Sequence, residues 1–129
     1  MTKTIFQKSL TTVAVCFAFP AMALAHEMAK GPNGGAVIDI EGHHVEFVSS
    51  PSELMFYLTG DKEAPIASAG AKMKAIIQDA GKTAQIELTA VEPNKLVGKT
   101  DVPLGAGAKV VVTGTLSDGH VLQGRFVTP

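Results

Sequence analysis

The residues best suited to chemistry in this sequence are its histidines, of which the chain has four. A neutral imidazole is a common ligand of Zn(II) and Cu(II), so the spacing of these residues decides whether a metal site can form. Asp118 and His120 flank Gly119 at the tip of a predicted hairpin, where both side chains can turn toward one ion. The alternative interpretation is that Asp118 and Gly119 only form the turn and His120 begins a strand.

A further ligand depends on how the N-terminus is processed. Lys3 and Lys8 accompany a mostly apolar run at 11–19 that is too short to span a bilayer, and residues 23–25 have the small-x-small pattern of a cleavage site. The sequence therefore predicts a secretory signal peptide at 1–25 and a periplasmic protein that is not inserted in the membrane after cleavage. A short membrane anchor and a lipoprotein attached through a cysteine are the alternatives.

Cleavage would make His26 the first residue of a single mature domain at 26–129. A terminal histidine offers its α-amine and its imidazole to one metal ion, and the low pKa of that amine lets a metal displace its proton near neutral pH. Met28 lies close by in sequence and would suit Cu(I), which prefers thioether ligands. Cleavage also removes Cys16, the only cysteine, which excludes disulfides, thiolate copper sites and cysteine nucleophiles.

Short strand-like runs between turn residues must position these side chains. The runs with strand character are 36–40, 43–48, 53–59, 71–79, 83–91, 95–99, 109–116 and 120–127. They predict an all-β fold, an antiparallel β-sandwich of about seven to eight short strands, with a small open barrel as the alternative. The segment 26–35 has little strand character and is predicted to be an extended arm.

Two more histidines are adjacent on one predicted strand. Successive side chains of a strand face opposite sides, so His43 and His44 cannot both bind one ion without distortion. His44 does share a face with Glu46, and such a His-x-Glu pair is a candidate metal site or a support for the ligands of one. A solvated strand face beside a glycine turn is the alternative interpretation of this pair.

Four segments near the C-terminus match a known pattern. They read PLGAG at 103–107, KVVVT at 109–113, SDGH at 117–120 and GRF at 124–126. Together they resemble the end of the CopC family, small periplasmic copper-binding β-sandwiches whose mature chains begin with histidine. In that family the N-terminal histidine and the Asp and His of the DGH motif bind Cu(II). The resemblance therefore implies His26, Asp118 and His120 as ligands of Cu(II).

A different set of segments has a second resemblance. These segments read GPNGG at 31–35, HVEF at 44–47, FYL at 56–58 and RF at 125–126. They resemble small exported domains associated with heavy-metal efflux adaptors. This second resemblance implies an accessory domain in which His44 and Glu46 bind copper or zinc.

Composition narrows the function further. The formal net charge of −1 argues against nucleic acid, whose phosphates require an excess of Lys and Arg. The chain has no nucleophile elbow and no phosphate loop. It also has no tryptophan and a single tyrosine, whereas copper enzymes that cleave polysaccharides present a broad aromatic face. We therefore expect a binding protein rather than an enzyme.

The expected function is copper sequestration or delivery in metal homeostasis or resistance, with Cu(II) favoured and zinc as the second metal. A metal-efflux or copper-import membrane protein is the expected partner. Two alternatives are an accessory domain of a heavy-metal efflux system and a structural or interaction β-sandwich that binds no metal.

Overall fold

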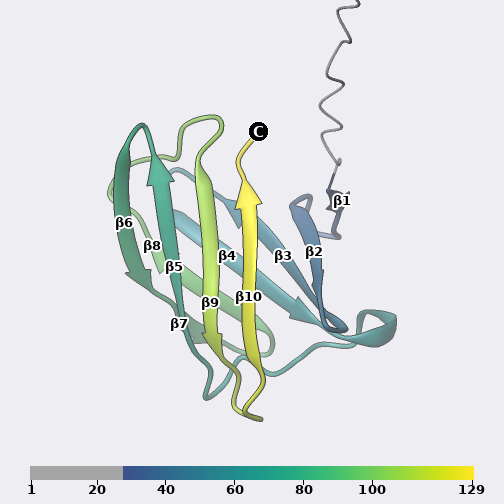
Figure 1. Ribbon diagram of the computed structural model, residues 1–129. Helices are drawn as coiled ribbons and strands as arrows, with labels where there is room; N and C mark the ends of the chain where they lie inside the picture. The colour runs from purple at the N-terminus through teal and green to yellow at the C-terminus, as the bar shows by residue number, and fades with distance from the viewer. Residues whose placement is uncertain (1–27) are drawn as a thin grey trace, which may run out of the picture.

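The computed structural model describes residues 28–129 as two antiparallel sheets that face each other (Figure 1). The six-stranded sheet has the order β1 (Ala29–Lys30), β2 (Ala36–Ile40), β3 (His43–Ser49), β4 (Glu53–Thr59), β8 (Lys95–Lys99) and β7 (Thr89–Val91). The four-stranded sheet has the order β10 (Val121–Val127), β9 (Lys109–Thr115), β5 (Lys72–Asp79) and β6 (Lys82–Glu87). The prediction of an all-β antiparallel sandwich is confirmed.

Helical structure is minor in this part of the chain. One short 3-10 turn, η1 (Asp61–Glu63), lies between β4 and β5. Within residues 28–129 there is no helix with the length and apolar character needed to cross a membrane.

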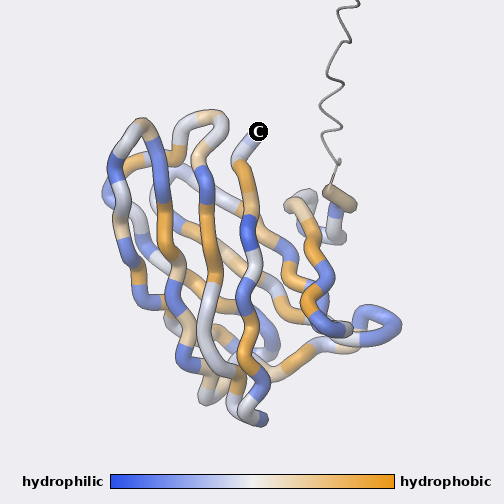
Figure 2. Tube along the Cα trace, viewed as in Figure 1, coloured by the Kyte–Doolittle hydropathy of each residue, from blue (hydrophilic) through white to orange (hydrophobic). Residues whose placement is uncertain are grey.

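The core lies between the sheets and arises from alternation along each strand. On β4 the side chains of Leu54, Phe56 and Leu58 are buried, and the residues between them are more exposed. Figure 2 shows the apolar positions recurring along the strands of both sheets. The rings of Phe47, Phe56 and Phe126 meet in the interior. Phe47 is stacked on Phe56 with ring centroids 5.1 Å apart, and Phe126 is tilted against these two rings at 5.2 and 6.0 Å. Because burial of one such ring contributes about 1.5–3 kcal/mol, this cluster is a principal contact between the sheets.

The structure has ten strands between residues 28 and 129 where the sequence predicts seven to eight, and two local differences account for this. The predicted strand at 83–91 is two strands, because β6 pairs with β5 in one sheet and β7 pairs with β8 in the other. Leu88 is buried at this crossing, and its N–H donates to the Met73 carbonyl oxygen at 3.0 Å. The predicted arm at 26–35 is wrong in part, because β1 forms within it and pairs with β2.

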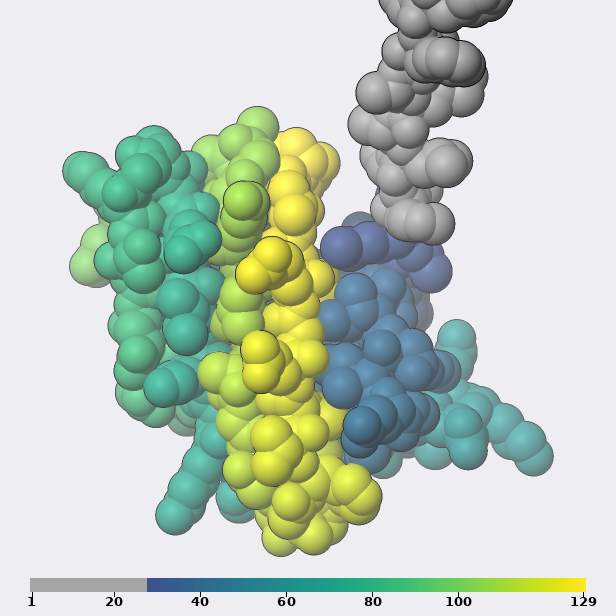
Figure 3. Space-filling model, viewed as in Figure 1, coloured from purple at the N-terminus to yellow at the C-terminus, as the bar shows by residue number. Residues whose placement is uncertain are grey.

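β10 and β2 belong to different sheets but lie against each other along one side of the sandwich. Figure 3 shows the yellow atoms of the C-terminal strand meeting the blue atoms of the N-terminal strands. Gly124 permits this approach, because a Cβ there would overlap the end of the Ile38 side chain and press on that of Ile40. The contact brings the end of β2 and the start of β10 to the same end of the sandwich (Figure 1).

Two hairpin turns project from that end. Glu41 and Gly42 connect β2 to β3 with φ angles of 52° and 84°, as a two-residue type I′ turn requires. The β9–β10 turn is closed by Gly119, which has a φ of 92° and whose N–H donates to the Leu116 carbonyl oxygen at 3.0 Å. This geometry is a type I turn followed by a left-handed glycine, the usual form of a three-residue hairpin loop.

Candidate metal centre

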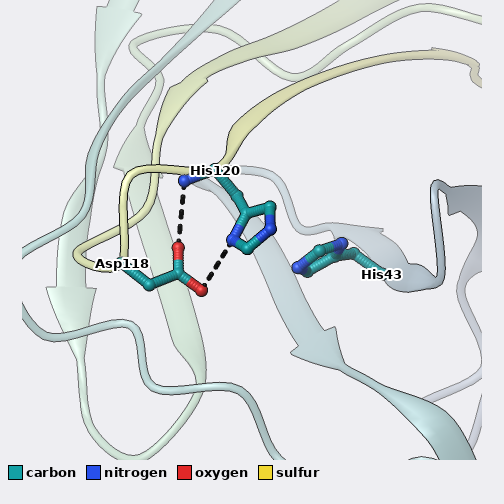
Figure 4. A group of neighbouring side chains, drawn as sticks. All are labelled: His43, Asp118 and His120. Carbon is teal, nitrogen blue, oxygen red and sulfur yellow. Dashed lines mark hydrogen bonds and ion pairs between the residues drawn. The ribbon is translucent and has the colours of Figure 1, made fainter.

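Three side chains with metal-binding atoms come together where the two turns project (Figure 4). His43 is the first residue of β3, Asp118 lies in the β9–β10 turn, and His120 directly precedes β10. One ligand atom of each residue lies within 4.8 Å of those of the other two. The cluster therefore joins the six-stranded sheet to the four-stranded sheet.

The register of β2 and β3 places His43 in this cluster. Ile40 and His43 form the last pair before the type I′ turn, and His43 shares the face of the core residues Val45 and Phe47. At the end of the sheet this face looks toward the β9–β10 turn, so the half-buried imidazole meets the ring of His120. The centroids of the two rings lie 5.0 Å apart, and their planes are tilted by 51°. The Nδ1 atom of His43 lies 3.3 Å from the Ile40 carbonyl oxygen.

Asp118 contacts His120 twice. Its Oδ1 accepts the backbone N–H of His120 at 3.0 Å, and its Oδ2 lies 2.8 Å from Nδ1 of the His120 ring. The backbone hydrogen bond first, and then the bond to the ring, hold the pKa of the Asp118 carboxyl below its ordinary value. The side chains of His120 and Asp118 are 59% and 53% exposed, so an ion can reach the pair from solution.

Two imidazoles and a carboxylate form a donor set for a borderline divalent metal ion. Imidazole nitrogen and carboxylate oxygen both bind Zn(II) and Cu(II). Metal–ligand distances of about 2.0–2.2 Å require ligand atoms roughly 3–4 Å apart. The ligand atoms here lie within 4.8 Å of one another, which is close to this separation. Three donors leave coordination positions open to water or to another ligand.

The structure brings together two of the predicted ligands, Asp118 and His120, and adds His43 to them. The predicted terminal ligand, His26, lies outside the described residues. The position of His43 was indicated in the sequence. His43 lies two residues before Val45 and therefore on the same face of the strand, and it directly follows a two-residue turn. Recognising it as a ligand also required the contact between the two sheets, which no local pattern shows.

His44 and Glu46, the second candidate pair, lie on the opposite face of β3. Nε2 of His44 lies 2.9 Å from Oδ2 of Asp39. Glu46 is buried, and its carboxylate accepts hydrogen bonds from the backbone N–H of Asn33, the side-chain amide of Asn33 and the backbone N–H of Gly35, at 2.8, 3.0 and 2.9 Å. Both oxygens of Glu46 are thus engaged in holding the β1–β2 turn against the sheet.

Met28, the predicted soft ligand, lies at the other end of the sandwich. It lines a groove with Val127 and Thr128, at the end of β10, whereas His120 precedes the start of that strand. A strand rises about 3.3 Å per residue, so the seven residues of β10 span roughly 20 Å. The structure therefore does not bring Met28 to the cluster.

Comparisons of the chain with known protein families, with characterised proteins and with solved structures found no match. The resemblances to the CopC family and to efflux-associated domains therefore remain predictions from short motifs. The candidate metal centre is supported by its own geometry.

Proposed function

We propose that this protein binds a divalent transition metal ion, with Cu(II) favoured and Zn(II) as the second metal, and that it sequesters or delivers copper in the periplasm. The observation that carries this proposal is the cluster of His43, Asp118 and His120, whose ligand atoms lie within 4.8 Å of one another. The ligands come from both sheets and meet at an exposed end, where they contribute little to the core.

The types of donor favour divalent copper. Cu(II) binds nitrogen and oxygen ligands more tightly than Zn(II) does, in accordance with the Irving–Williams order. The cluster contains no sulfur, whereas Cu(I) prefers thiolate or thioether ligands.

The openness of the cluster supports binding and release. Structural zinc sites are usually closed by four protein ligands. Here the side chains of His120 and Asp118 are 59% and 53% exposed, so a bound ion stays accessible to a ligand from another protein. We propose a metal-efflux or copper-import membrane protein as that partner, and a role in binding rather than catalysis.

The test is a calorimetric titration of the protein beginning at His26 with Cu(II) and Zn(II), in competition with a chelator. His43→Ala should weaken binding by about 100-fold or more, because loss of a ligand costs at least as much as loss of the group that supports one. The matched control is His44→Ala, which removes the adjacent histidine from the opposite face of β3 and should leave the affinity unchanged.

Two results would contradict the proposal. Equal affinities of His43→Ala and the unsubstituted protein would remove the cluster from metal binding. Absence of stoichiometric metal in the unsubstituted protein would favour a structural or interaction β-sandwich. A form with one extra residue before His26 measures the terminal chelate separately, because only a terminal site loses affinity there.

A further inference from the structure

Asp118 has both carboxylate oxygens directed at one residue. Oδ1 accepts the backbone N–H of His120 at 3.0 Å, and Oδ2 lies 2.8 Å from Nδ1 of its ring. An ionised carboxylate has no proton to donate and can only accept hydrogen bonds, so the ring must donate through Nδ1–H. This arrangement fixes both the orientation of the His120 ring and its tautomer.

His43 has the equivalent arrangement with a different acceptor. Its Nδ1 lies 3.3 Å from the carbonyl oxygen of Ile40, and a carbonyl only accepts. A neutral imidazole with Nδ1–H has its lone pair on Nε2. Figure 4 shows the ring nitrogen of His120 that does not contact Asp118 turned toward the ring of His43. In the same view one ring nitrogen of His43 lies on the side that faces His120, so the free lone pairs of both rings lie between the two residues.

We propose that Asp118 is a positioning residue rather than a ligand, and that the metal ion binds to Nε2 of His43 and Nε2 of His120. Asp118 holds His120 in the Nδ1–H tautomer, and the Ile40 carbonyl does the same for His43. This inference rests on the proposed function, because it assigns roles within the same site. It also makes the site a two-nitrogen site with its remaining positions open to water or to a donor from a partner.

Direct coordination by Asp118 would require more rearrangement. An ion bound to Oδ2 and to Nδ1 of His120 would replace the proton of the 2.8 Å hydrogen bond. His43 would then have to reach that side of the His120 ring. Binding through the two Nε2 atoms keeps both Nδ1 contacts, and a carboxylate behind a metal-bound histidine is a common support that also raises the basicity of the ligand.

The direct test is long-range ¹H–¹⁵N NMR of the histidine rings, without metal and during titration with Zn(II). Without metal, His43 and His120 should both show the Nδ1–H tautomer. On addition of Zn(II), Nε2 of both rings should show the coordination shift while Nδ1 of His120 stays protonated. A coordination shift at Nδ1 of His120, or an Nε2–H tautomer of His120 without metal, would overturn the inference.

The outcomes separate this inference from the proposed function. If Zn(II) and Cu(II) shift or broaden neither ring, the proposed function fails, and the assignment of metal-bound atoms fails with it. If both rings respond but His120 binds through Nδ1, the proposed function stands and the positioning role of Asp118 is wrong.

Variants of Asp118 provide a second readout. Loss of a supporting carboxylate typically weakens metal binding by about 10–100-fold, so Asp118→Ala should fall in this range. Asp118→Asn keeps one oxygen that accepts Nδ1–H and should lose less affinity. Both variants should keep coordination through two Nε2 atoms. An affinity of Asp118→Ala equal to that of the unsubstituted protein would overturn the inference, as would an equal loss in both variants.

The matched control is Asp39→Asn. Asp39 contacts His44 at 2.9 Å, so it forms the same type of pair on the opposite face of β3. Its substitution should leave the Zn(II) affinity and the ring signals of His43 and His120 unchanged.

Discussion

β3 carries two consecutive histidines on opposite faces. Each histidine has acidic neighbours, but these neighbours have different roles on the two faces. On one face His43 meets Asp118 and His120, whose ligand atoms converge on a small region. On the other face His44 pairs with Asp39, and the neighbouring Glu46 is buried under the β1–β2 turn. The type of residue therefore does not decide which face is suited to bind a metal.

The two faces differ in which donor atoms are free. Exposure does not separate them, because the side chains of His44 and Asp39 are themselves 37% and 59% exposed. The Glu46 carboxylate accepts N–H groups of Asn33 and Gly35 with both oxygens, so it is committed to the fold. The His44 face thus has a single imidazole, whereas the His43 face has two.

The largest effect is expected from Glu46→Ala, which removes the buried carboxylate beside His44. Glu46 accepts three hydrogen bonds, and each bond to a charged group contributes about 1.5–3 kcal/mol. The substitution leaves the buried N–H of Gly35 without an acceptor, so we expect a loss of at least about 4 kcal/mol in the free energy of unfolding. Urea denaturation measures this loss. Glu46→Gln, which keeps one acceptor oxygen, should lose less. Zn(II) affinity of the folded protein should be unchanged, and a loss of affinity without a loss of stability would return Glu46 to the list of ligands.

The next effect is the stabilisation by bound metal. A ligand present at 100 times its Kd raises the free energy of unfolding by about 3 kcal/mol when it binds only the folded state. We expect this increase with Zn(II) in the unsubstituted protein and in His44→Ala, and a much smaller one in His43→Ala. Thermal denaturation with and without Zn(II) measures it. Equal stabilisation of the two variants by Zn(II) would mean that the two faces of β3 do not differ in metal binding.

A smaller effect is expected from Gly124→Val, which tests whether the contact between β2 and β10 supports the His43 face. The added side chain would overlap Ile38, and overpacking of this kind costs about 1–3 kcal/mol. Because the same contact aligns the two turns, Zn(II) affinity should also fall. Gln123→Val, at the adjacent exposed position, is the control. Both properties should stay unchanged in it, and an unchanged affinity in Gly124→Val would separate the site from this contact.

The smallest effect concerns the stability of the metal-free protein in acid. The pKa of Asp118 is lowered from its ordinary value of 3.8 by hydrogen bonds to His120. A lowered pKa means that the carboxylate stabilises the fold above pH 3.8 and that this contribution disappears as the pH falls through the lower, folded-state pKa. The difference in Tm between the unsubstituted protein and Asp118→Asn should therefore be small and positive at neutral pH and shrink in acid. A difference that grows in acid would contradict this.

Alternation of apolar residues predicted most of the fold. The strands at Glu53–Thr59 and Lys95–Lys99 have the predicted bounds, because each buries one face in the core. The same alternation hid the division at Leu88. Ile86, Leu88 and Ala90 all turn toward the interior, so the inward pattern continues while the backbone passes from one sheet to the other.

The sequence predicted part of the candidate site for a similar reason. Asp118 and His120 are joined by a turn, so local spacing was enough to bring them together. His43 reaches them only through the contact between two sheets. Glu46 is buried because the β1–β2 turn folds back over β3 and donates hydrogen bonds to its carboxylate. The sequence shows only a glutamate at an outward position of a strand and does not indicate this contact.

The ends of β10 have a practical consequence for handling the protein. Pro129 follows β10 at one end of the sandwich, and His120 precedes the strand at the opposite end (Figure 1). If the protein were attached to a surface through Pro129, the β2–β3 and β9–β10 turns would point into the solution. They would lie about 20 Å or more from the point of attachment. Immobilisation in that orientation leaves the end of the sandwich that carries His43 and His120 accessible from the solution.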